Sequence, residues 1–327
     1  MKVRLFALLV LTSLAVTLLF SYGRTQTSDK DNVIWQIEPQ FDQAFQFSEG
    51  LAVVRNGGNW NYINKNGKIQ YNSFGILSHA TFADNFSEGL AAIKYEGKWG
   101  YINKQFKIVI NPQFYDRGSF SEGLACMRTF YINKKGETVI RNTFDWGGDF
   151  SEGLADVHVI VEGKTKAGFI NKEGKVVIEP QFASAYSFRE GLAVVSVGDP
   201  LKRKYGFIDK EGKFVIEPVF YNVSNGFYEG LAAVQKDKNG KYGFINKKGE
   251  FVIKPQFENA YWFCEGLAAV QKEKDGKMGF IDKEGKFVIE PQFSWIRYGF
   301  YEGLAVVQKE KDGKYGYIKN PLKTSRQ

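Results

Sequence analysis

Eight glutamates recur in one short motif, F-x-E-G-L-A, and they are the first residues to consider for chemistry. Carboxylates repeated around a ring could bind cations, or could serve as acid and base on a polysaccharide. The alternative is structural, because a carboxylate beside a tight glycine turn can accept backbone N–H bonds and hold the start of a strand. We favour the structural role and expect no catalytic residue, since a group needed in every unit serves the architecture. The eight are Glu49, Glu88, Glu122, Glu152, Glu190, Glu229, Glu265 and Glu302.

The other residues form no recognisable reaction centre. His79 and His158 lie in different units, with no cysteine or carboxylate at metal-ligand spacing, so we expect no metal site. The sequence has no phosphate-binding loop, nucleophile elbow or dinucleotide fingerprint. Lysine-rich segments such as K-E-K-D-G-K lack the alternating acidic ligands of calcium loops. The sequence therefore predicts a protein that is not an enzyme and that needs no cofactor.

Two tryptophans are candidates for ligand binding. Trp146 stands in D-W-G-G-D and Trp295 in S-W-I-R-Y, and both segments are irregular beside their counterparts in other units. An exposed indole could stack on a sugar ring. Aromatic residues at one place in every unit more often pack between units, and that alternative is favoured for the rest of the series.

A basic loop is the other candidate. The distance from the motif glutamate to the next G-aromatic-I varies between units, and the longer loops include 158–166 and 196–204. Lys202, Arg203 and Lys204 in the second of these could bind an anionic polymer, because binding residues concentrate on loops held by a rigid scaffold. A solvated turn is the favoured alternative, since lysine is common at turns and edges.

These residues must be positioned by short strands. In the unit from Phe227 to Phe257, Leu231 to Gln235 and Tyr242 to Asn246 are β-prone runs around an Asn- and Gly-rich turn, which predicts a hairpin. An N-K-K-G turn leads to a third strand at Phe251 to Ile253, which Pro255 is expected to end. Residues 257–262 are read either as a fourth strand or as a connector.

The recurring sequence motifs resemble those of a known family. G-K-W-G-Y-I-N-K at 97–104, Y-G-F-I-D-K-E-G-K-F-V-I-E-P at 205–218 and the repeated P-Q-F are similar to WG repeats, also called KWG repeats, which are common in bacteria. The resemblance covers almost all of the chain after its first residues. It implies a β-rich protein and says little about activity. Some units depart from the pattern: Asn61 and Phe130 replace the glycine that follows the aromatic residue.

The repeat predicts an all-β fold of eight units of about 36 residues each. The chain begins and stops part way through a unit, so its first strand can complete its last sheet. A closed ring like a β-propeller is therefore the favoured architecture. An open β-solenoid or superhelical stack of β-meanders is the alternative, because about 36 residues is short for a four-stranded blade. We place the repeat domain at 33–320 and a C-terminal tail at 321–327.

The N-terminal end predicts export. Lys2 and Arg4 precede an apolar run, and small or polar residues follow it, so 1–26 is read as a signal peptide and 27–32 as a linker. Cleavage is favoured over a membrane anchor formed by residues 5–22, which is the one expected contact with a membrane. The location would then be periplasmic, extracellular or on the cell surface. Cys126 and Cys264 occupy different places in their units, so we expect no disulfide.

The resulting hypothesis is a secreted, non-enzymatic scaffold that binds an extracellular or envelope partner, protein or glycan, through its variable loops. The alternatives are an enzyme acting on an envelope polysaccharide and a purely structural envelope protein. A formal charge of +8 is a mild excess, and we expect no nucleic-acid partner. The expected oligomeric state is a monomer.

Overall fold

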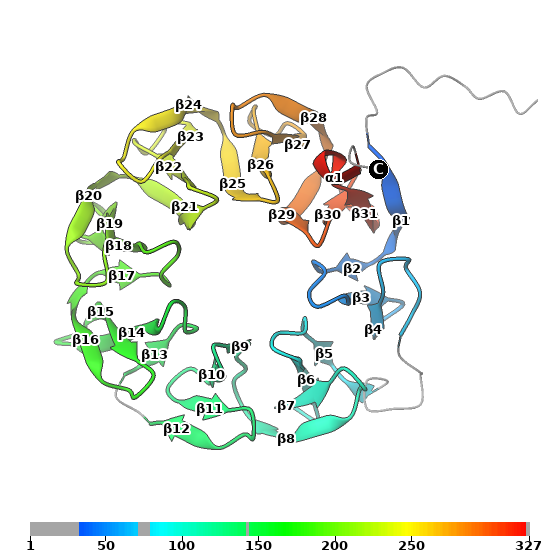
Figure 1. The fold of residues 1–327 in the computed structure, drawn as a ribbon, viewed down its shortest axis with the longest axis horizontal. Helices are drawn as coiled ribbons and strands as arrows, with labels where there is room; N and C mark the ends of the chain where they lie inside the picture. Colours follow the sequence, from blue (N-terminus) through cyan, green and yellow to red (C-terminus); the bar gives the residue numbers. More distant parts are fainter. Residues whose placement is uncertain (1–32, 71–78, 142–143, 325–327) are drawn as a thin grey trace, which may run out of the picture. The chain divides into compact units, whose positions relative to one another are not determined.

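A computed structural model describes residues 33–70, 79–141 and 144–324. The predicted signal peptide and linker, 1–32, lie outside the described residues. From Val33 onward the chain is one compact unit in which short sheets follow one another around a central opening (Figure 1). The sheets are antiparallel meanders, and each is one blade of a closed eight-bladed β-propeller. The prediction of a closed ring of eight units is confirmed, and the open stack is excluded.

Each blade has four strand positions, counted outward from the opening. The innermost strands are β2 (Gln43–Ala44), β5 (Phe82–Ala83), β9 (Phe120–Ser121), β13 (Trp146–Gly147), β17 (Ser184–Ala185), β21 (Asn222–Tyr228), β25 (Asn259–Cys264) and β29 (Trp295–Tyr301). The second strands are β3 (Ala52–Asn56), β6 (Leu90–Tyr95), β10 (Leu124–Cys126), β14 (Leu154–Val161), β18 (Ala193–Val197), β22 (Leu231–Gln235), β26 (Leu267–Gln271) and β30 (Leu304–Gln308).

The third strands are β4 (Asn59–Ile63), β7 (Lys98–Asn103), β11 (Tyr131–Asn133), β15 (Lys164–Asn171), β19 (Lys204–Ile208), β23 (Tyr242–Ile245), β27 (Met278–Ile281) and β31 (Tyr315–Lys319). The outermost strands are β8 (Ile108–Phe114), β12 (Thr138–Ile140), β16 (Val176–Phe182), β20 (Phe214–Phe220), β24 (Phe251–Phe257), β28 (Phe287–Phe293) and β1 (Trp35–Phe41). In blade 1, made of β2, β3 and β4, the described residues contribute three strands and an isolated bridge between Ile63 and Ile69.

The two ends of the repeat array meet in blade 8. Strand β1 pairs antiparallel with β31, so the sheet order is β1-β31-β30-β29 and the first strand of the chain is the outermost strand of the last blade. A short helix, α1 (Pro321–Thr324), follows β31. The closure predicted from the incomplete units at the two ends is therefore present.

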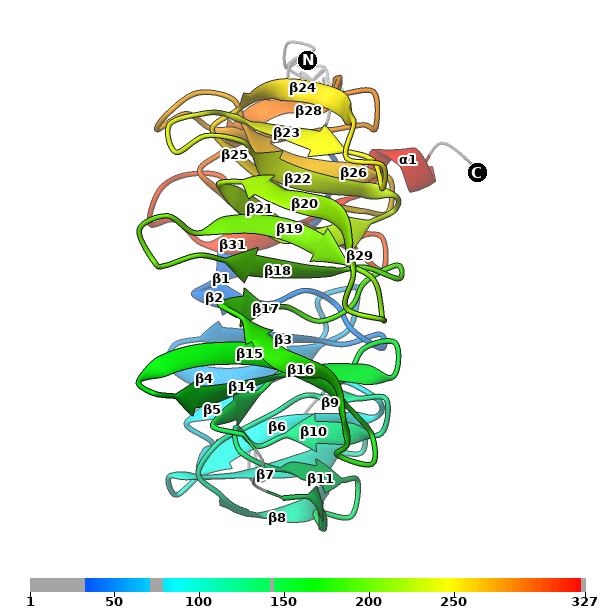
Figure 2. The same cartoon turned by 90° about the vertical axis from the view of Figure 1, so that its left-hand side faces the viewer.

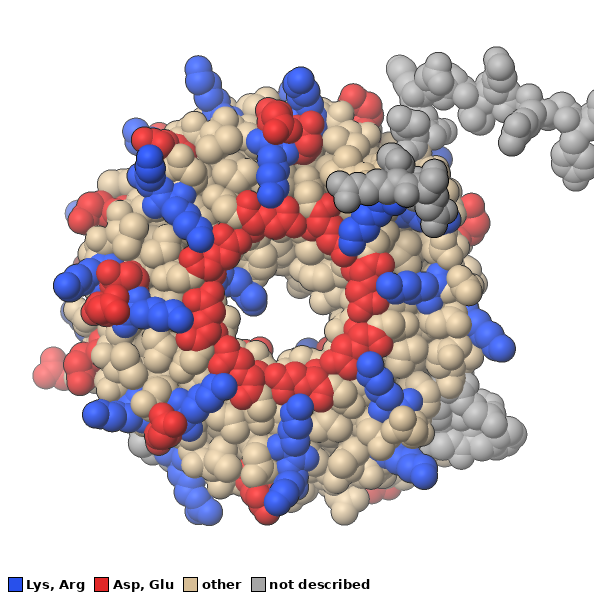
Figure 3. All heavy atoms as spheres, in the orientation of Figure 1, with Lys and Arg blue, Asp and Glu red and all other residues tan. Residues whose placement is uncertain are grey.

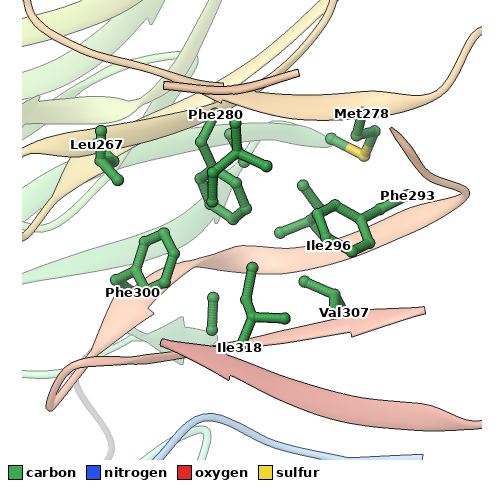
Figure 4. Packing of buried hydrophobic residues seen from close by; sticks show 11 residues of the cluster. Leu267, Met278, Phe280, Phe293, Ile296, Phe300, Val307 and Ile318 are labelled. Carbon is green, nitrogen blue, oxygen red and sulfur yellow. The ribbon is translucent and has the colours of Figure 1, made fainter. Parts of the chain in front are cut away.

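The hydrophobic core is divided into eight clusters, one between each pair of neighbouring blades. The cluster between blades 7 and 8, for example, joins Phe280 and Phe293 to Ile296, Phe300 and Ile318 (Figure 4). A unit cut from the ring would expose two such apolar faces, which is why the repeats depend on their neighbours.

The motif phenylalanine is the centre of each cluster. It is at most 1% exposed in every unit. Its ring lies 4.7–5.0 Å, centroid to centroid, from the aromatic ring that precedes isoleucine in the third strand of the preceding blade. Tilted contacts of this kind add to the free energy gained by burying the rings. Phe207 and Phe227, at 4.8 Å, are one such pair.

The outermost strands differ from the prediction. Strand β24 continues through Pro255 to Phe257, so the expectation that Pro255 ends the strand is wrong. Its register against β23 shifts between Tyr242 and Phe244, and a Cβ on Gly243 would lie 2.7 Å from the Pro255 nitrogen. A proline lacks the ladder N–H but is tolerated at an irregularity on an outer strand. The undecided segment 257–262 is divided between the end of β24 and the innermost strand of the next blade, β25.

Candidate functional site

The motif glutamate lies in the turn that joins the innermost strand of a blade to the second. The eight glutamates have φ between 51° and 56°, and the glycines after them have φ between 83° and 89°. Two successive positive values define a type I′ turn, whose twist suits a tight hairpin. The glycine is needed for its φ, because a Cβ there would meet no atom within 4 Å in most units. The glutamate adopts the same left-handed backbone region although, unlike glycine, it has a Cβ that disfavours positive φ.

The glutamate side chain bonds to the next blade and not to its own turn. Each carboxylate accepts the N–H of the motif glycine one unit further on, at 2.9–3.3 Å. Glu302 of the last blade bonds to Gly50 of the first, at 3.1 Å, so the series has no gap. Ser48, Ser87, Ser121 and Ser151 each donate to a carbonyl of the next motif phenylalanine at 2.6–2.7 Å.

A lysine of the next blade also pairs with every motif glutamate, at 2.8–3.4 Å between nitrogen and oxygen. In seven cases this lysine follows isoleucine and Asn or Asp at the end of a third strand, as Lys104 does. Asn320 has that place in blade 8 and donates to the backbone carbonyl of Glu265 at 3.0 Å. Lys323 of helix α1 supplies the cation instead, 2.8 Å from the Glu265 carboxylate.

These contacts define the motif face, the side of the ring that carries the F-x-E-G-L-A turns and the I-N-K or I-D-K turns. Figure 3 shows a ring of acidic side chains around the opening with basic side chains reaching it from outside. Every motif carboxylate has both an N–H donor and a cation as partners, which favours the structural role. The Lys104 ammonium and the Gly89 N–H outweigh desolvation and hold the pKa of Glu49 below its ordinary value.

The opposite side of the ring is the hairpin face, defined by the turns between second and third strands. Each second strand runs away from the motif turn, so these turns, whose length varies most, lie together. Figure 2 shows the tips of the β14–β15 and β18–β19 hairpins on one side of the disc and α1 on the other. Two pockets open among these hairpins, and both adjoin blade 4, which is built from β13, β14, β15 and β16.

The first, the Trp146 pocket, is lined by residues of blades 2, 3 and 4 and has a volume of about 450 Å³. Blade 3 has the shortest hairpin among the described units, with three residues in β10 and three in β11, and this leaves space beside blade 4. The charged and aromatic residues that line the pocket are Asp84, Asp116, Arg117, Arg128, Trp146 and Asp149.

Trp146 is held by residues beneath it. It is the cross-strand partner of His158 on β14, and the two rings stack at 4.8 Å with planes 14° apart. His158 Nε2 lies 3.2 Å from a carboxylate oxygen of Asp156, and both side chains are buried. Ser187 contacts Asp156 and not the imidazole, so the three residues do not form a nucleophilic triad.

The glycines of D-W-G-G-D make room for this arrangement. A Cβ on Gly148 would lie 2.3 Å from Asp156 Oδ1, and one on Gly147 would lie 2.6 Å from the Tyr131 hydroxyl. Gly148 also donates its N–H to the Asp156 carbonyl at 2.9 Å. The irregular segment is therefore fitted to a buried aspartate one strand away.

Asp149 differs from the other acidic residues of the pocket. Asp149 is exposed and lines the pocket, and no hydrogen bond or ion pair to its carboxylate is present among the described residues. Desolvation and the charge of Asp156 raise its pKa to about 6, although Arg189 opposes the shift. Asp84, in contrast, is paired with Arg117.

The second hollow, the Arg203 pocket, lies between the hairpins of blades 4 and 5 and has a volume of about 500 Å³. Lys164, Lys166, Asp199 and Arg203 line it. The structure corrects the predicted loop at 158–166: both ends belong to strands β14 and β15, and Glu162 and Gly163 form the turn between them. These strands extend the wall of the pocket.

The other sequence candidates lie outside both pockets. Trp295 is at the start of β29 and packs edge to face on Tyr315 at 5.7 Å. Lys202 is exposed in the loop next to Arg203. Lys204 begins β19, and its ammonium lies 3.5 Å from the Lys236 carbonyl. The structure thus brings Trp146 and Arg203 to separate pockets on the hairpin face and leaves the remaining three candidates apart.

A run of aromatic side chains crosses the innermost strands of blades 6 to 8. Trp262 stacks on Tyr228 at 5.4 Å and on Tyr298 at 5.0 Å, and Arg189 lies over Tyr228. Because these rings stack on one another, their faces are largely occupied by protein. We interpret the run as packing between blades, the role favoured for the aromatic series from sequence.

Sequence reasoning missed Asp84, Arg117, Asp149 and Asp156 as members of a site. The two aspartates of blade 4 are seven residues apart, one just after β13 and the other on β14, and Asp84 comes from another blade. The one available signal was the irregular D-W-G-G-D segment with the short third unit before it. Within the described residues no group of three or more potential ligands could hold a metal ion, and no helix has the length and apolarity to span a membrane.

Comparison with solved structures finds propellers. A structure titled as the eukaryotic initiation factor is 11% identical and has a TM-score of 0.52, covering 78% of this chain and 77% of that one. The β-propeller domain of the Trilobed protease from Pyrococcus furiosus is 12% identical, with a TM-score of 0.48 and coverage of 86% and 96%. A streptogramin B lyase is 12% identical, with a TM-score of 0.42 and coverage of 88% and 97%. At these identities the likeness concerns the fold alone.

No curated protein matches the chain. The family model described as the WG containing repeat matches it eight times, at residues 35–60, 81–99, 99–129, 130–158, 168–199, 205–241, 242–277 and 278–315. These matches span more than half of the sequence and coincide with the repeating strands of the ring. The chain therefore belongs to the family of WG-repeat proteins.

Proposed function

We propose that this propeller is an exported, non-enzymatic binding protein that holds a glycan of the cell envelope in the Trp146 pocket. The observation that carries the proposal is the indole of Trp146, stacked on its buried partner His158 at the wall of a hollow of about 450 Å³. A ring held in one orientation from behind can present its other face to a sugar with little loss of side-chain entropy.

The polar residues around the indole suit the hydroxyl groups of a sugar. Asp149 and Asp116 provide acceptors, and Arg117 and Arg128 provide donors, so a bound ring could exchange its hydrogen bonds with water for bonds with protein. The motif face offers no comparable set, since its carboxylates are already paired.

A binding panel tests this proposal. The mature protein, residues 27–327, is titrated calorimetrically with neutral oligosaccharides derived from envelope polysaccharides. We expect Trp146→Ala to abolish binding and Trp295→Ala, the matched control outside the pocket, to leave it unchanged. Equal loss in both variants, or unaltered binding in Trp146→Ala, would contradict the proposal.

Hydrolysis of the bound glycan is a second candidate function. One observation favours it: Asp149 has its pKa raised to about 6, and the charge of Asp156 is one of the causes. A carboxylic acid protonated near neutral pH beside a second carboxylate can protonate a leaving group. Release of reducing ends by the wild-type protein, lost in Asp149→Asn with binding retained, would support hydrolysis. Binding without any release would leave the protein as a binding module.

The proposed location depends on residues 1–26. Expression of the full-length chain in a bacterium, followed by mass determination of the product from the medium and the cell fractions, tests it. A product beginning between Gly23 and Thr27 would support cleavage and export, and an intact N-terminus in the membrane fraction would support the anchor.

A further inference from the structure

The Arg203 pocket is the second pocket described on the hairpin face, and the proposed function does not use it. Strands β14 and β15, of eight residues each, form the longest hairpin among the described residues and make one wall. Val197, the last residue of β18, and the loop 198–203 that joins β18 to β19 make the other. The space between them, about 500 Å³, is large enough for one or two sugar rings.

The lining of this pocket is cationic. Lys164, Lys166 and Arg203 contribute three positive charges, and Asp199 is the one carboxylate among the residues that line it. Like charges gathered in a hollow repel one another, and the repulsion is relieved when an anion enters. Among the residues that the structure describes, the one contact of the Lys166 ammonium is a long one of 3.5 Å, with the Gln181 carbonyl.

Arg203 is incompletely satisfied. Its Nε is buried and has no hydrogen-bond partner within the described part of the chain. A buried donor without a partner costs free energy, and a guanidinium can donate two parallel bonds to a planar or tetrahedral anion. An anion in the pocket would neutralise the Arg203 charge and accept hydrogen bonds from the part of the guanidinium that lines it. This distinguishes Arg203 from its neighbour Lys202, which is exposed and outside the lining.

We propose that the Arg203 pocket binds the anionic substituent of an acidic glycan, so that the two pockets beside blade 4 select a polymer carrying carboxylate, sulfate or phosphate groups. The assignment of the polymer to glycans rests on the proposed function. A nucleic acid fits less well, because no aromatic side chain lines this pocket to stack on a base and the cations do not extend as a stripe.

Titration with defined oligomers tests the proposal. Oligogalacturonate carries carboxylates, a sulfated oligosaccharide carries sulfates, and a teichoic-acid oligomer carries phosphates; a neutral oligomer of equal length is the reference. Calorimetry at 50 and 200 mM NaCl gives the affinity and its salt dependence. We expect at least one anionic oligomer to bind more tightly than the neutral one, and the preferred oligomer identifies the substituent.

Substitutions then locate the site. Arg203→Gln should weaken the binding of the preferred anionic oligomer by about tenfold. Lys202→Gln, the neighbouring control, should weaken it by less than about twofold. Arg203→Lys retains the charge without the paired donors and should fall between them. Thermal unfolding of each variant checks that the ring is intact.

Equal weakening by Arg203→Gln and Lys202→Gln would show diffuse attraction to a positively charged protein and would overturn the proposal. Absence of any preference for anionic oligomers would overturn it too. The Trp146 pocket is judged separately, by neutral oligomers and Trp146→Ala. If that variant binds normally while Arg203→Gln loses the anionic ligand, the proposed function fails and the anion site stands.

Discussion

Removing one motif carboxylate measures how much its contacts with the next blade contribute to the free energy of unfolding. Glu49 accepts the Gly89 N–H at 3.0 Å and pairs with Lys104 at 3.0 Å, with 27% of its side chain exposed. A hydrogen bond to a charged group contributes about 1.5–3 kcal/mol, and the partial exposure places this one near the lower limit. An ion pair with Lys104, whose side chain is 41% exposed, contributes about 0.2–1 kcal/mol.

Two substitutions separate these contributions. Glu49→Ala removes both, and we expect it to lower the free energy of unfolding by about 2 kcal/mol. Glu49→Gln keeps an acceptor for the N–H and loses only the charge, so its cost should be about 0.5–1 kcal/mol. All three side chains have a Cβ, so the positive φ of this turn affects them alike and cancels from the comparison.

Urea unfolding followed by circular dichroism provides the assay. Glu38→Gln, at an exposed glutamate of β1 for which no ion pair is present among the described residues, is the control and should change stability by less than about 0.5 kcal/mol. In 1 M NaCl, where the screening length is about 3 Å, the gap between wild type and Glu49→Gln should shrink, and the gap between Gln and Ala should persist. Equal destabilisation by Gln and Ala would refute the reasoning, because the backbone bond would then contribute nothing.

Two further predictions concern the same scaffold. Gly206→Ala should lower the free energy of unfolding by about 1–3 kcal/mol, because its Cβ would lie 2.6 Å from the Ile216 carbonyl oxygen. Asn61→Ala, at the equivalent place in blade 1, is the control and should change the free energy of unfolding little. If urea unfolding shows no loss of stability in Gly206→Ala, the packing argument is contradicted. The melting temperature should fall as the pH drops below about 4.5. Desolvation opposes ionisation, but lysines and backbone N–H groups lower the pKa of Glu49 and Glu122, so their stabilisation exists above the unfolded value and is lost as the pH falls through the folded one. Melting curves from pH 7 to pH 3 test this, and a flatter fall in Glu49→Gln is expected.

Much of the fold could be predicted from this one sequence because its eight units can be compared with one another. Glycines, prolines and phenylalanines that recur at fixed places mark turns, edges and core, and the incomplete units at both ends indicate how the ring closes. The partner of the motif glutamate could not be predicted in this way. Every unit contains both the carboxylate and the N–H, so the pattern is the same whether the bond lies within a unit or between two.

The candidate site is predictable only where it breaks the repeat. Trp146 and Arg203 stand in irregular segments, and the structure places both in pockets. Asp149 stands in the same irregular segment as Trp146, but Asp156 looks ordinary in sequence, and the proximity of the two depends on the cross-strand register of β13 and β14. The substitution of Lys323 for the missing repeat lysine also depends on where helix α1 folds back, which four residues do not indicate.

The pairing of β1 with β31 sets an order of events for the growing chain. Trp35 to Phe41 is synthesised before the rest of the propeller, yet its strand partner, Tyr315 to Lys319, is among the last propeller segments made. Until then the first strand has no sheet to join, and the apolar side of blade 1 that faces blade 8 is uncovered. The nascent chain therefore keeps this apolar side uncovered until residues 315–319 are made, and a chain truncated before residue 315 would leave β1 without its partner strand.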